Sequence, residues 1–157
     1  LTVSDHVTAI LEEVTSSGNL ILVHNTFITN EQIGALKKRP GLFYCLCLES
    51  NRYIAGKMPP VRLLYEEGCN IVIGTDSLAS NSRLDMLSEL KTIGAHFPEI
   101  NLETLVRWAT FNGALALGET SWAGSIEPGK RPGLVLIKNT DLVNRRLTSR
   151  STALRLI

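Results

Sequence analysis

Three short apolar segments, each followed by polar residues, constrain the fold of this chain more than any other feature. They are residues 20–23, 42–47 and 70–73. Such continuous short runs predict strands that are buried on both faces. Segments with the apolar spacing of a helix lie between them. This alternation predicts β-α-β units with a parallel sheet and helices outside it, so we expect an α/β fold.

The helices between and after these strands carry start and stop signals. Thr29-Asn30-Glu31-Gln32 has the spacing of a capping box and predicts the start of a helix. The helix that begins at the Pro-Pro pair of residues 59–60 is expected to turn Val61, Leu64 and Tyr65 inward. Further helices are expected at residues 7–14, from about 84 to 95, and from about 101 onward.

The character of the sequence changes after Gly118. Residues 124–130 (Gly-Ser-Ile-Glu-Pro-Gly-Lys) are rich in turn formers and lead into residues 134–137, which predict a strand. The tail at residues 145–157 alternates weakly and predicts a final strand. The last part of the chain is therefore expected to be β-structure.

Composition excludes several classes of protein. A chain of 157 residues with a formal net charge of +1 predicts one domain and no bulk attraction to nucleic acid or membrane. Hydrophobic residues make up 44%, which is enough for a sizeable core. No apolar run approaches the roughly 20 residues of a transmembrane helix, and the first residues do not resemble a signal peptide.

The three cysteines, Cys45, Cys47 and Cys69, are interpreted as structural. Cys-x-Cys within a strand places two thiols on one face, but it is not the Cys-x-x-Cys of redox or structural zinc sites. We expect buried free thiols in a reducing compartment, and hence a cytoplasmic protein.

Candidate functional residues follow each predicted strand. His24 comes after the first, Ser50 and Asn51 after the second, and Asp76 and Ser77 after the third. The carboxyl ends of parallel strands open on one edge of the sheet, where ligands bind. The sequence therefore predicts one rim with a carboxylate and an imidazole, which suits a divalent metal or acid–base chemistry.

Each of these residues also has a structural explanation. A lone histidine at a strand end, such as His24, is often a hydrogen-bonded structural residue. A lone aspartate at a strand end, such as Asp76, often caps the next helix, and Asn51 can fix a turn. The joint pattern over three strands favours function. The residues interpreted as structural are His6 and His96 at the surface and Trp108 and Trp122 in the core.

Several segments resemble the amidohydrolase superfamily in the right order. Residues 24–26 (His-Asn-Thr), 47–51 (Cys-Leu-Glu-Ser-Asn) and 74–81 (Gly-Thr-Asp-Ser-Leu-Ala-Ser-Asn) are similar to the last three strands of its barrel. Residues 110–118 and 124–130 match it as well. The similarity is closest to the branch of cytosine deaminases, adenosylhomocysteine deaminases and chlorohydrolases.

The resemblance implies roles for the rim residues. Asp76 would contact the metal and take a proton from the attacking water, and His24 would polarise the substrate or the tetrahedral intermediate. Ser50 and Asn51 would shape a loop, and Ser77 would orient Asp76. The implied metal is zinc, with iron and manganese as alternatives, and the implied substrate is a small molecule such as a heterocyclic amine.

Parts of the family's site are absent from this sequence. The family also uses a His-x-His pair, a further metal-binding histidine and a nearby glutamate, and a chain with three histidines cannot build that site. We therefore expect strands six to eight of a metal-dependent (β/α)8 barrel in residues 1–123, and strands of a small composite β domain in residues 124–157. The fragment is expected to be inactive alone, with metal binding left open. Its open sheet edges predict either self-association or a truncated piece of a longer enzyme.

Two functions remain open at this level. The first is a metal-dependent hydrolase acting on carbon–nitrogen bonds other than peptide bonds, of the deaminase or chlorohydrolase type. The alternative is a non-catalytic domain with an open parallel sheet that binds a small ligand or a partner. No glycine-rich phosphate loop follows any predicted strand, which counts against nucleotide binding in the second case.

Overall fold

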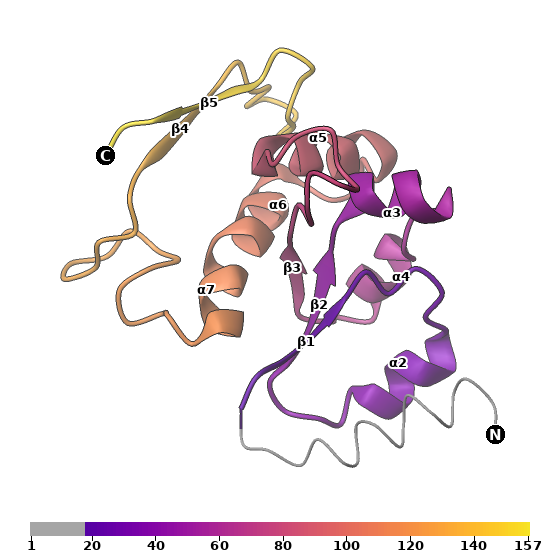
Figure 1. Ribbon diagram of the computed structural model, residues 1–157. Coiled ribbons are helices and arrows are strands. Elements are labelled where there is room, and N and C mark those ends of the chain that lie inside the picture. Colours follow the sequence, from indigo (N-terminus) through magenta and orange to yellow (C-terminus); the bar gives the residue numbers. More distant parts are fainter. Residues whose placement is uncertain (1–17) are drawn as a thin grey trace.

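The computed structural model describes residues 18–157, so the helix predicted at residues 7–14 and His6 lie outside the described residues. A three-stranded parallel sheet forms its centre, in the order β1 (Leu20–Val23), β2 (Leu42–Leu46) and β3 (Ile71–Ile73) (Figure 1). Leu20 pairs with Leu42 in the first ladder and Tyr44 with Ile71 in the second. The predicted α/β arrangement with a parallel sheet is confirmed.

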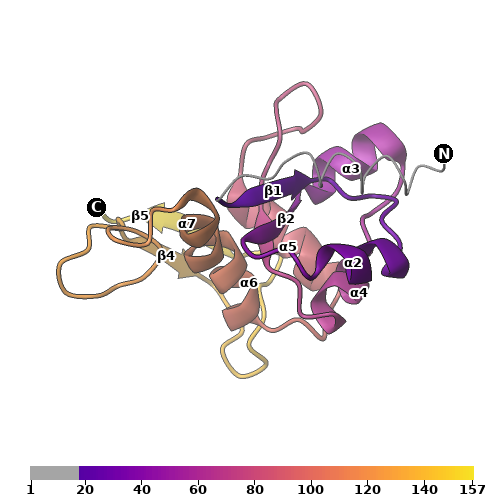
Figure 2. The ribbon, with the colours of Figure 1, turned by 90° about the horizontal axis from the view of Figure 1, so that it is seen from below.

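Six short helices surround this sheet in the described part of the chain (Figures 1 and 2). The helices are α2 (Asn30–Leu36), α3 (Leu48–Ala55), α4 (Val61–Glu66), α5 (Met86–His96), α6 (Leu102–Ala109) and α7 (Phe111–Leu117). The capping box at Thr29 is present, since its hydroxyl accepts from the backbone N of Gln32 and the Gln32 side chain accepts from the backbone N of Thr29. Asp85 and Asn101 cap α5 and α6 in the same manner, through side-chain oxygens.

One face of the sheet carries the hydrophobic core. Leu42, Tyr44 and Leu46 of β2 point into it, and the surrounding helices fill it. Val61 and Leu64 are fully buried there, as predicted. The other buried members are Ile33, Leu36, Leu48, Ile71, Ile73, Leu90, Ile93, Ile100, Leu105 and Trp108. Each Å² of apolar surface that these side chains remove from water contributes about 25 cal/mol. This burial holds the helices against the sheet.

The other face of the sheet is only partly covered. Phe43 and Val72 are buried beneath Ala116 of α7, with Ile21 and Cys45 at the margin. Val23 is 51% exposed, so the prediction that the first strand is buried on both faces is wrong. The physical reason is position, because β1 is at an edge of the sheet and Val23 is the last residue of that strand.

Two aromatic predictions are also corrected. Trp108 is buried, as expected, but Trp122 is 50% exposed and is not a core residue. Tyr65 is 37% exposed, although its ring packs edge-on against Trp108 with the centroids 5.9 Å apart. A ring at the margin of a core can make such a contact while its other side faces water.

The amino end of the sheet is closed by asparagine side chains. Asn70 Nδ2 donates to the carbonyl of Leu42 at 3.1 Å, and Asn112 Nδ2 donates to the carbonyl of Ile71 at 2.8 Å. Asn19 Nδ2 donates to the carbonyl of Leu115 at 2.7 Å and so ties α7 to the start of β1. These bonds satisfy backbone carbonyls that the sheet and the helix ends leave without partners.

The C-terminal part forms a separate two-stranded antiparallel sheet of β4 (Val135–Lys138) and β5 (Thr152–Arg155), which confirms both predicted strands (Figure 1). Its connecting segment reaches the main body where the backbone N of Leu102 donates to the carbonyl of Arg145 at 2.9 Å. Both strands are largely exposed. Within residues 18–157, no helix combines the length and the hydropathy needed to cross a membrane.

Candidate functional site

The carboxyl ends of the three parallel strands bring the predicted site residues together. His24 follows β1, Ser50 and Asn51 lie in the first turn of α3 after β2, and Asp76 follows β3. His24 Nε2 lies 3.9 Å from Asp76 Oδ2, and Ser50 and Asn51 contact Asp76 and His24 respectively. Four residues from three separated segments of the sequence therefore form one connected cluster.

The backbone is in an unusual conformation where two of these strands end. His24, Asn25 and Asp76 have φ angles of 71°, 55° and 58°, in the left-handed region that residues other than glycine rarely adopt. Such conformations cost about 1–3 kcal/mol each and concentrate at functional sites. Here they turn the chain at the end of β1 and β3, so that the side chains of His24 and Asp76 face each other.

Asp76 is held by two hydroxyl groups. Its Oδ2 atom accepts from Ser50 Oγ at 2.5 Å and from Ser80 Oγ at 2.7 Å. These two hydrogen bonds lower the pKa of Asp76 below its ordinary value, since they favour the ionised form. The side chain is 30% exposed, so Asp76 is accessible from the solvent.

Asn51 fixes the orientation of His24. Asn51 is 2% exposed, and its Nδ2 atom donates to Thr26 Oγ1 and, at 3.5 Å, to the carbonyl of His24. The amide oxygen therefore faces the ring, and it lies 3.0 Å from His24 Nδ1. Because that oxygen can only accept, Nδ1 carries a proton and Nε2 is the ring nitrogen turned toward Asp76.

The loop after β3 contributes a residue that the sequence interpretation missed. Ser77 was predicted to orient Asp76, but its side chain is exposed and it contributes through its backbone. Its carbonyl accepts from Ser80 Oγ at 3.3 Å. Ser80 is the residue of this loop whose side chain reaches Asp76. The available signal was its spacing, four residues after the carboxylate.

Helix α3 was also not expected, and it positions half of the site. It begins at Leu48 directly after β2 and ends at Gly56 in a left-handed conformation, with φ 61°. Its first turn places Ser50 toward Asp76 and Asn51 toward His24. Two consecutive side chains can therefore serve two different partners, since they lie about 100° apart around a helix.

Two thiols lie directly beneath the site. The side chains of Cys45 and Cys47 lie on one face, as predicted, and all three cysteines are free. Burial is less complete than expected, because only Cys47 is fully buried. A hydrogen bond from Cys47 lowers the pKa of Cys45. A Cβ placed on Gly74 would lie 2.9 Å from Cys45 Sγ, so a side chain at this position would require the sulfur to shift.

Asp76 is the residue of this cluster that suits a divalent metal. Asp76 fits one ligand position, because its carboxylate is accessible, has a lowered pKa and has an imidazole beside it. No group of three or more His, Cys, Asp or Glu side chains able to hold a metal ion occurs within residues 18–157. A complete metal site at Asp76 would therefore need ligands from outside this part of the chain.

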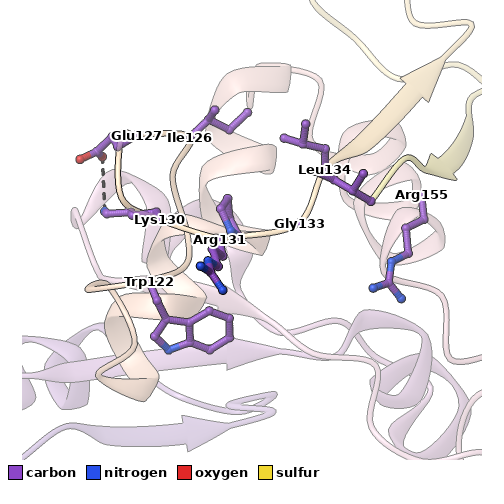
Figure 3. Close-up of a pocket in the computed structure, with 10 residues that line it drawn as sticks. Trp122, Ile126, Glu127, Lys130, Arg131, Gly133, Leu134 and Arg155 are labelled. Atoms are coloured by element: carbon purple, nitrogen blue, oxygen red, sulfur yellow. Dashed lines mark hydrogen bonds and ion pairs between the residues drawn. The ribbon is translucent and has the colours of Figure 1, made fainter.

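A hollow of about 630 Å³ lies elsewhere, on the segment that leads into β4 (Figure 3). Trp122, Ile126 and Leu134 line it, and Lys130 at its rim donates to Ser125 Oγ at 2.7 Å. None of the residues from the strand ends contributes to it. The hollow and the strand-end cluster are thus separate features.

Comparisons with known proteins point to one family. A family model described as "Amidohydrolase family" matches residues 3–152. The chain is 35% identical over 127 residues to a 5-methylthioadenosine/S-adenosylhomocysteine deaminase of Teredinibacter turnerae, over 76% of this chain and 28% of that protein. It is 40% identical over 96 residues to a 5'-deoxyadenosine deaminase of Methanothermobacter thermautotrophicus, over 56% of this chain and 22% of that protein.

A solved structure agrees with these sequence matches. The adenosine deaminase of Xanthomonas campestris, solved with bound zinc, superposes with a TM-score of 0.73 at 34% sequence identity. The superposition covers 88% of this chain and 33% of that one. The chain thus spans about a third or less of the length of the relatives that it matches.

Proposed function

The chain belongs to the amidohydrolase family, and we propose that it supplies one side of the active site of a metal-dependent deaminase. The cluster of His24, Ser50, Asn51 and Asp76 forms that side. In this proposal β1, β2 and β3 are the sixth to eighth strands of a (β/α)8 barrel, and residues 124–157 belong to a small β domain. The reaction is the hydrolysis of a carbon–nitrogen bond outside a peptide.

One observation carries the proposal. The carboxylate of Asp76, with two hydroxyl donors on Oδ2, faces the Nε2 atom of His24 at the carboxyl end of a parallel sheet. Both residues adopt left-handed backbone conformations there. Strained, polar and accessible strand ends are characteristic of catalytic sites in α/β proteins, whereas a carboxylate that only caps a helix needs none of these features.

The chemistry assigned to these residues is proton transfer and polarisation. As the oxygen of water adds to the carbon that bears the amino group, Asp76 takes one proton from that water. A proton returns to the nitrogen as the carbon–nitrogen bond breaks, and ammonia leaves. His24 polarises the substrate or the tetrahedral intermediate. The serine hydroxyls keep Asp76 ionised and oriented, which prepares it to act as the base.

A divalent metal fits one side of this cluster. Asp76 would be one of its ligands, and zinc is supported by the zinc in the similar Xanthomonas structure, with iron and manganese as alternatives. When bound, the ion lowers the pKa of water and stabilises negative charge during the addition. The remaining ligands would come from parts outside the described residues, so the isolated chain is proposed to be inactive.

The substrate is proposed to be a small heterocyclic amine. The relatives are named as deaminases of methylthioadenosine, S-adenosylhomocysteine, deoxyadenosine and adenosine. These substrates share a 6-aminopurine, and the amino group is the part that hydrolysis removes. A nucleoside of adenine is therefore the substrate class to test first.

The test uses the complete product of the gene that encodes this chain. Ammonia release is measured with adenosine, 5'-methylthioadenosine and S-adenosylhomocysteine, together with the zinc content. Asp76→Asn should lower kcat at least about 100-fold, since it removes the base while keeping the shape. Asp141→Asn makes the same chemical change in the turn between β4 and β5, where Asp141 accepts from Asn144, and should leave kcat unchanged. Normal turnover by the Asp76→Asn enzyme would show that the assignment is wrong.

A further inference from the structure

A buried carboxylate on α5 is not accounted for by the site described above. Glu89 is 0% exposed, and burial raises its pKa. Its Oε1 atom accepts from Asn81 Nδ2 at 2.8 Å, and its Oε2 atom accepts from the backbone N of Glu49 at 3.3 Å. A buried acidic side chain is costly unless such donors satisfy it, so this arrangement calls for an explanation.

The two partners of Glu89 are the chain neighbours of the two donors to Asp76. Glu49 precedes Ser50, and Asn81 follows Ser80. One carboxylate oxygen therefore holds the start of α3, and the other holds the loop after β3. The two segments meet at Asp76 Oδ2, where both serine hydroxyls donate.

Further contacts make this connection rigid. Asn81, which is 8% exposed, donates also to the carbonyl of Thr75 at 2.8 Å, directly before Asp76. Its amide oxygen accepts from the backbone N of Arg83 at 3.3 Å, which fixes the amide orientation. On the next turn of α5, Thr92 Oγ1 donates to Glu49 Oε1 at 2.5 Å. Helix α5 thus contacts both segments through side chains with defined donor and acceptor roles.

We propose that Glu89 is a positioning residue that places Ser50 and Ser80 on Asp76, and so sets the orientation of that carboxylate. This inference rests on the proposed role of Asp76 as the base. Glu89 forms no hydrogen bond with His24 or Asp76, and it acts through Glu49 and Asn81. Removal of its acceptor oxygens should therefore disturb catalysis more than it disturbs the folding of the core.

Glutamine is the sharpest substitution, because it preserves size and shape. Both partners of Glu89 donate, so the amide NH2 of glutamine would face a donor at one of the two positions. Asn81 cannot compensate by rotating its amide without losing its bonds to Thr75 and Arg83. Glu89→Gln is thus expected to release one of the two segments while it leaves the packing of α5 in place.

The first experiment separates kcat from KM in the complete gene product. Glu89→Gln should lower kcat at least about tenfold with KM changed by less than about threefold, because orientation of the base matters in the transition state. The control is Ile93→Val, one turn further along α5, which shortens a fully buried side chain. It should leave kcat within about twofold. Equal effects of the two substitutions on kcat would overturn the proposal.

The second experiment does not depend on turnover. A crystal structure of Glu89→Gln should show that at least one of the two serine contacts to Asp76, at 2.5 and 2.7 Å here, is lost. Retention of both contacts would overturn the inference, whatever the activity. If instead Asp76→Asn is fully active, the proposed function fails while the structural result still stands, so the two failures are distinguishable.

The third experiment tests the route of the effect. In a Ser50→Ala, Ser80→Ala background, Glu89→Gln should change kcat by less than about twofold, because the groups that it positions are already absent. A full tenfold loss in that background would overturn the proposal, since Glu89 would then act by another path. Should Glu89→Gln fail to fold, Asn81→Ser removes one donor and should release the Ser80 contact, and an unchanged contact would count against the inference.

Discussion

The two ends of the parallel sheet use polar side chains in different ways. At the amino end, Asn19, Asn70 and Asn112 donate to backbone carbonyls. At the carboxyl end, Asp76 and His24 contact other side chains, from segments far away in the sequence. Polar side chains occur at both ends, so polarity alone does not distinguish the ends.

This difference indicates at which end of the sheet a side chain can be substituted without loss of the fold. A side chain that satisfies a carbonyl contributes to stability, and its loss leaves a buried group without a partner. A side chain that is hydrogen-bonded to another side chain orients it. The loss of such a side chain therefore mainly changes the orientation of its partner. This contrast predicts stability defects from substitutions at the amino end and chemical defects from substitutions at the carboxyl end.

The largest effect is expected at His24. His24→Gln in the complete gene product should lower kcat at least about 100-fold, equivalent to about 2.7 kcal/mol, while the midpoint of thermal unfolding changes little. His96→Gln is the matched control, because His96 is an exposed imidazole whose Nδ1 lies 2.9 Å from the carbonyl of Thr92. The contrast between the two ends would break if His24→Gln unfolded the protein but spared kcat.

An intermediate effect is expected at the amino end. Asn112→Ala should lower the free energy of unfolding by about 1–2 kcal/mol, because the carbonyl of Ile71 loses its side-chain donor. Urea denaturation measures this change, and kcat should stay within about twofold of the wild type. Asn144→Ala, in the exposed turn after β4, serves as the control. A tenfold fall in kcat for Asn112→Ala would contradict the division of roles.

The smallest effect concerns the pH dependence of stability. Two hydroxyl donors lower the pKa of Asp76, so its ionised form stabilises the fold above the ordinary pKa of an aspartate. That stabilisation is lost as pH falls through the lowered pKa. Ser50→Ala should raise the pKa of Asp76, and Ser80→Ala should raise it less, because Ser50 makes the stronger contribution.

Carbon-13 NMR titration of the Asp76 carboxyl measures the pKa of Asp76 directly in the wild type, in Ser50→Ala and in Ser80→Ala. The stability difference between the wild type and Ser50→Ala should be present at neutral pH and should disappear in strong acid, where Asp76 is protonated in every variant. Equal pKa values in the wild type and both serine variants would show that the hydroxyls do not sustain the ionised form.

Much of the fold follows from local patterns. The three parallel strands, the capping box at Thr29 and the burial of Val61 and Leu64 depend on residues close together in sequence. The meeting of His24 with Asp76 was predicted because parallel strands share one open edge. The exposure of Val23 was not, because it depends on which neighbours cover a strand and not on the strand itself.

The parts of the site that sequence interpretation missed depend on how the loop after β3 and helix α5 fold. Ser80 acts on Asp76 through a loop conformation, and Glu89 acts on the start of α3 from forty residues away. Helix α3 itself was hidden because its first residues follow β2 without a conventional cap, since Cys47 makes no capping hydrogen bond. Nothing in the local spacing of Glu89 distinguishes it from a surface polar group.

The close approach at Gly74 has a consequence for how this sequence can vary. The sulfur atoms of Cys45 and Cys47 occupy the volume that a side chain at position 74 would need. A methyl group at position 74, directly after β3, therefore fits only if a sulfur atom moves. Natural variation at positions 45, 47 and 74 should be correlated, with a larger residue at 74 accepted only where a sulfur has been replaced by something smaller.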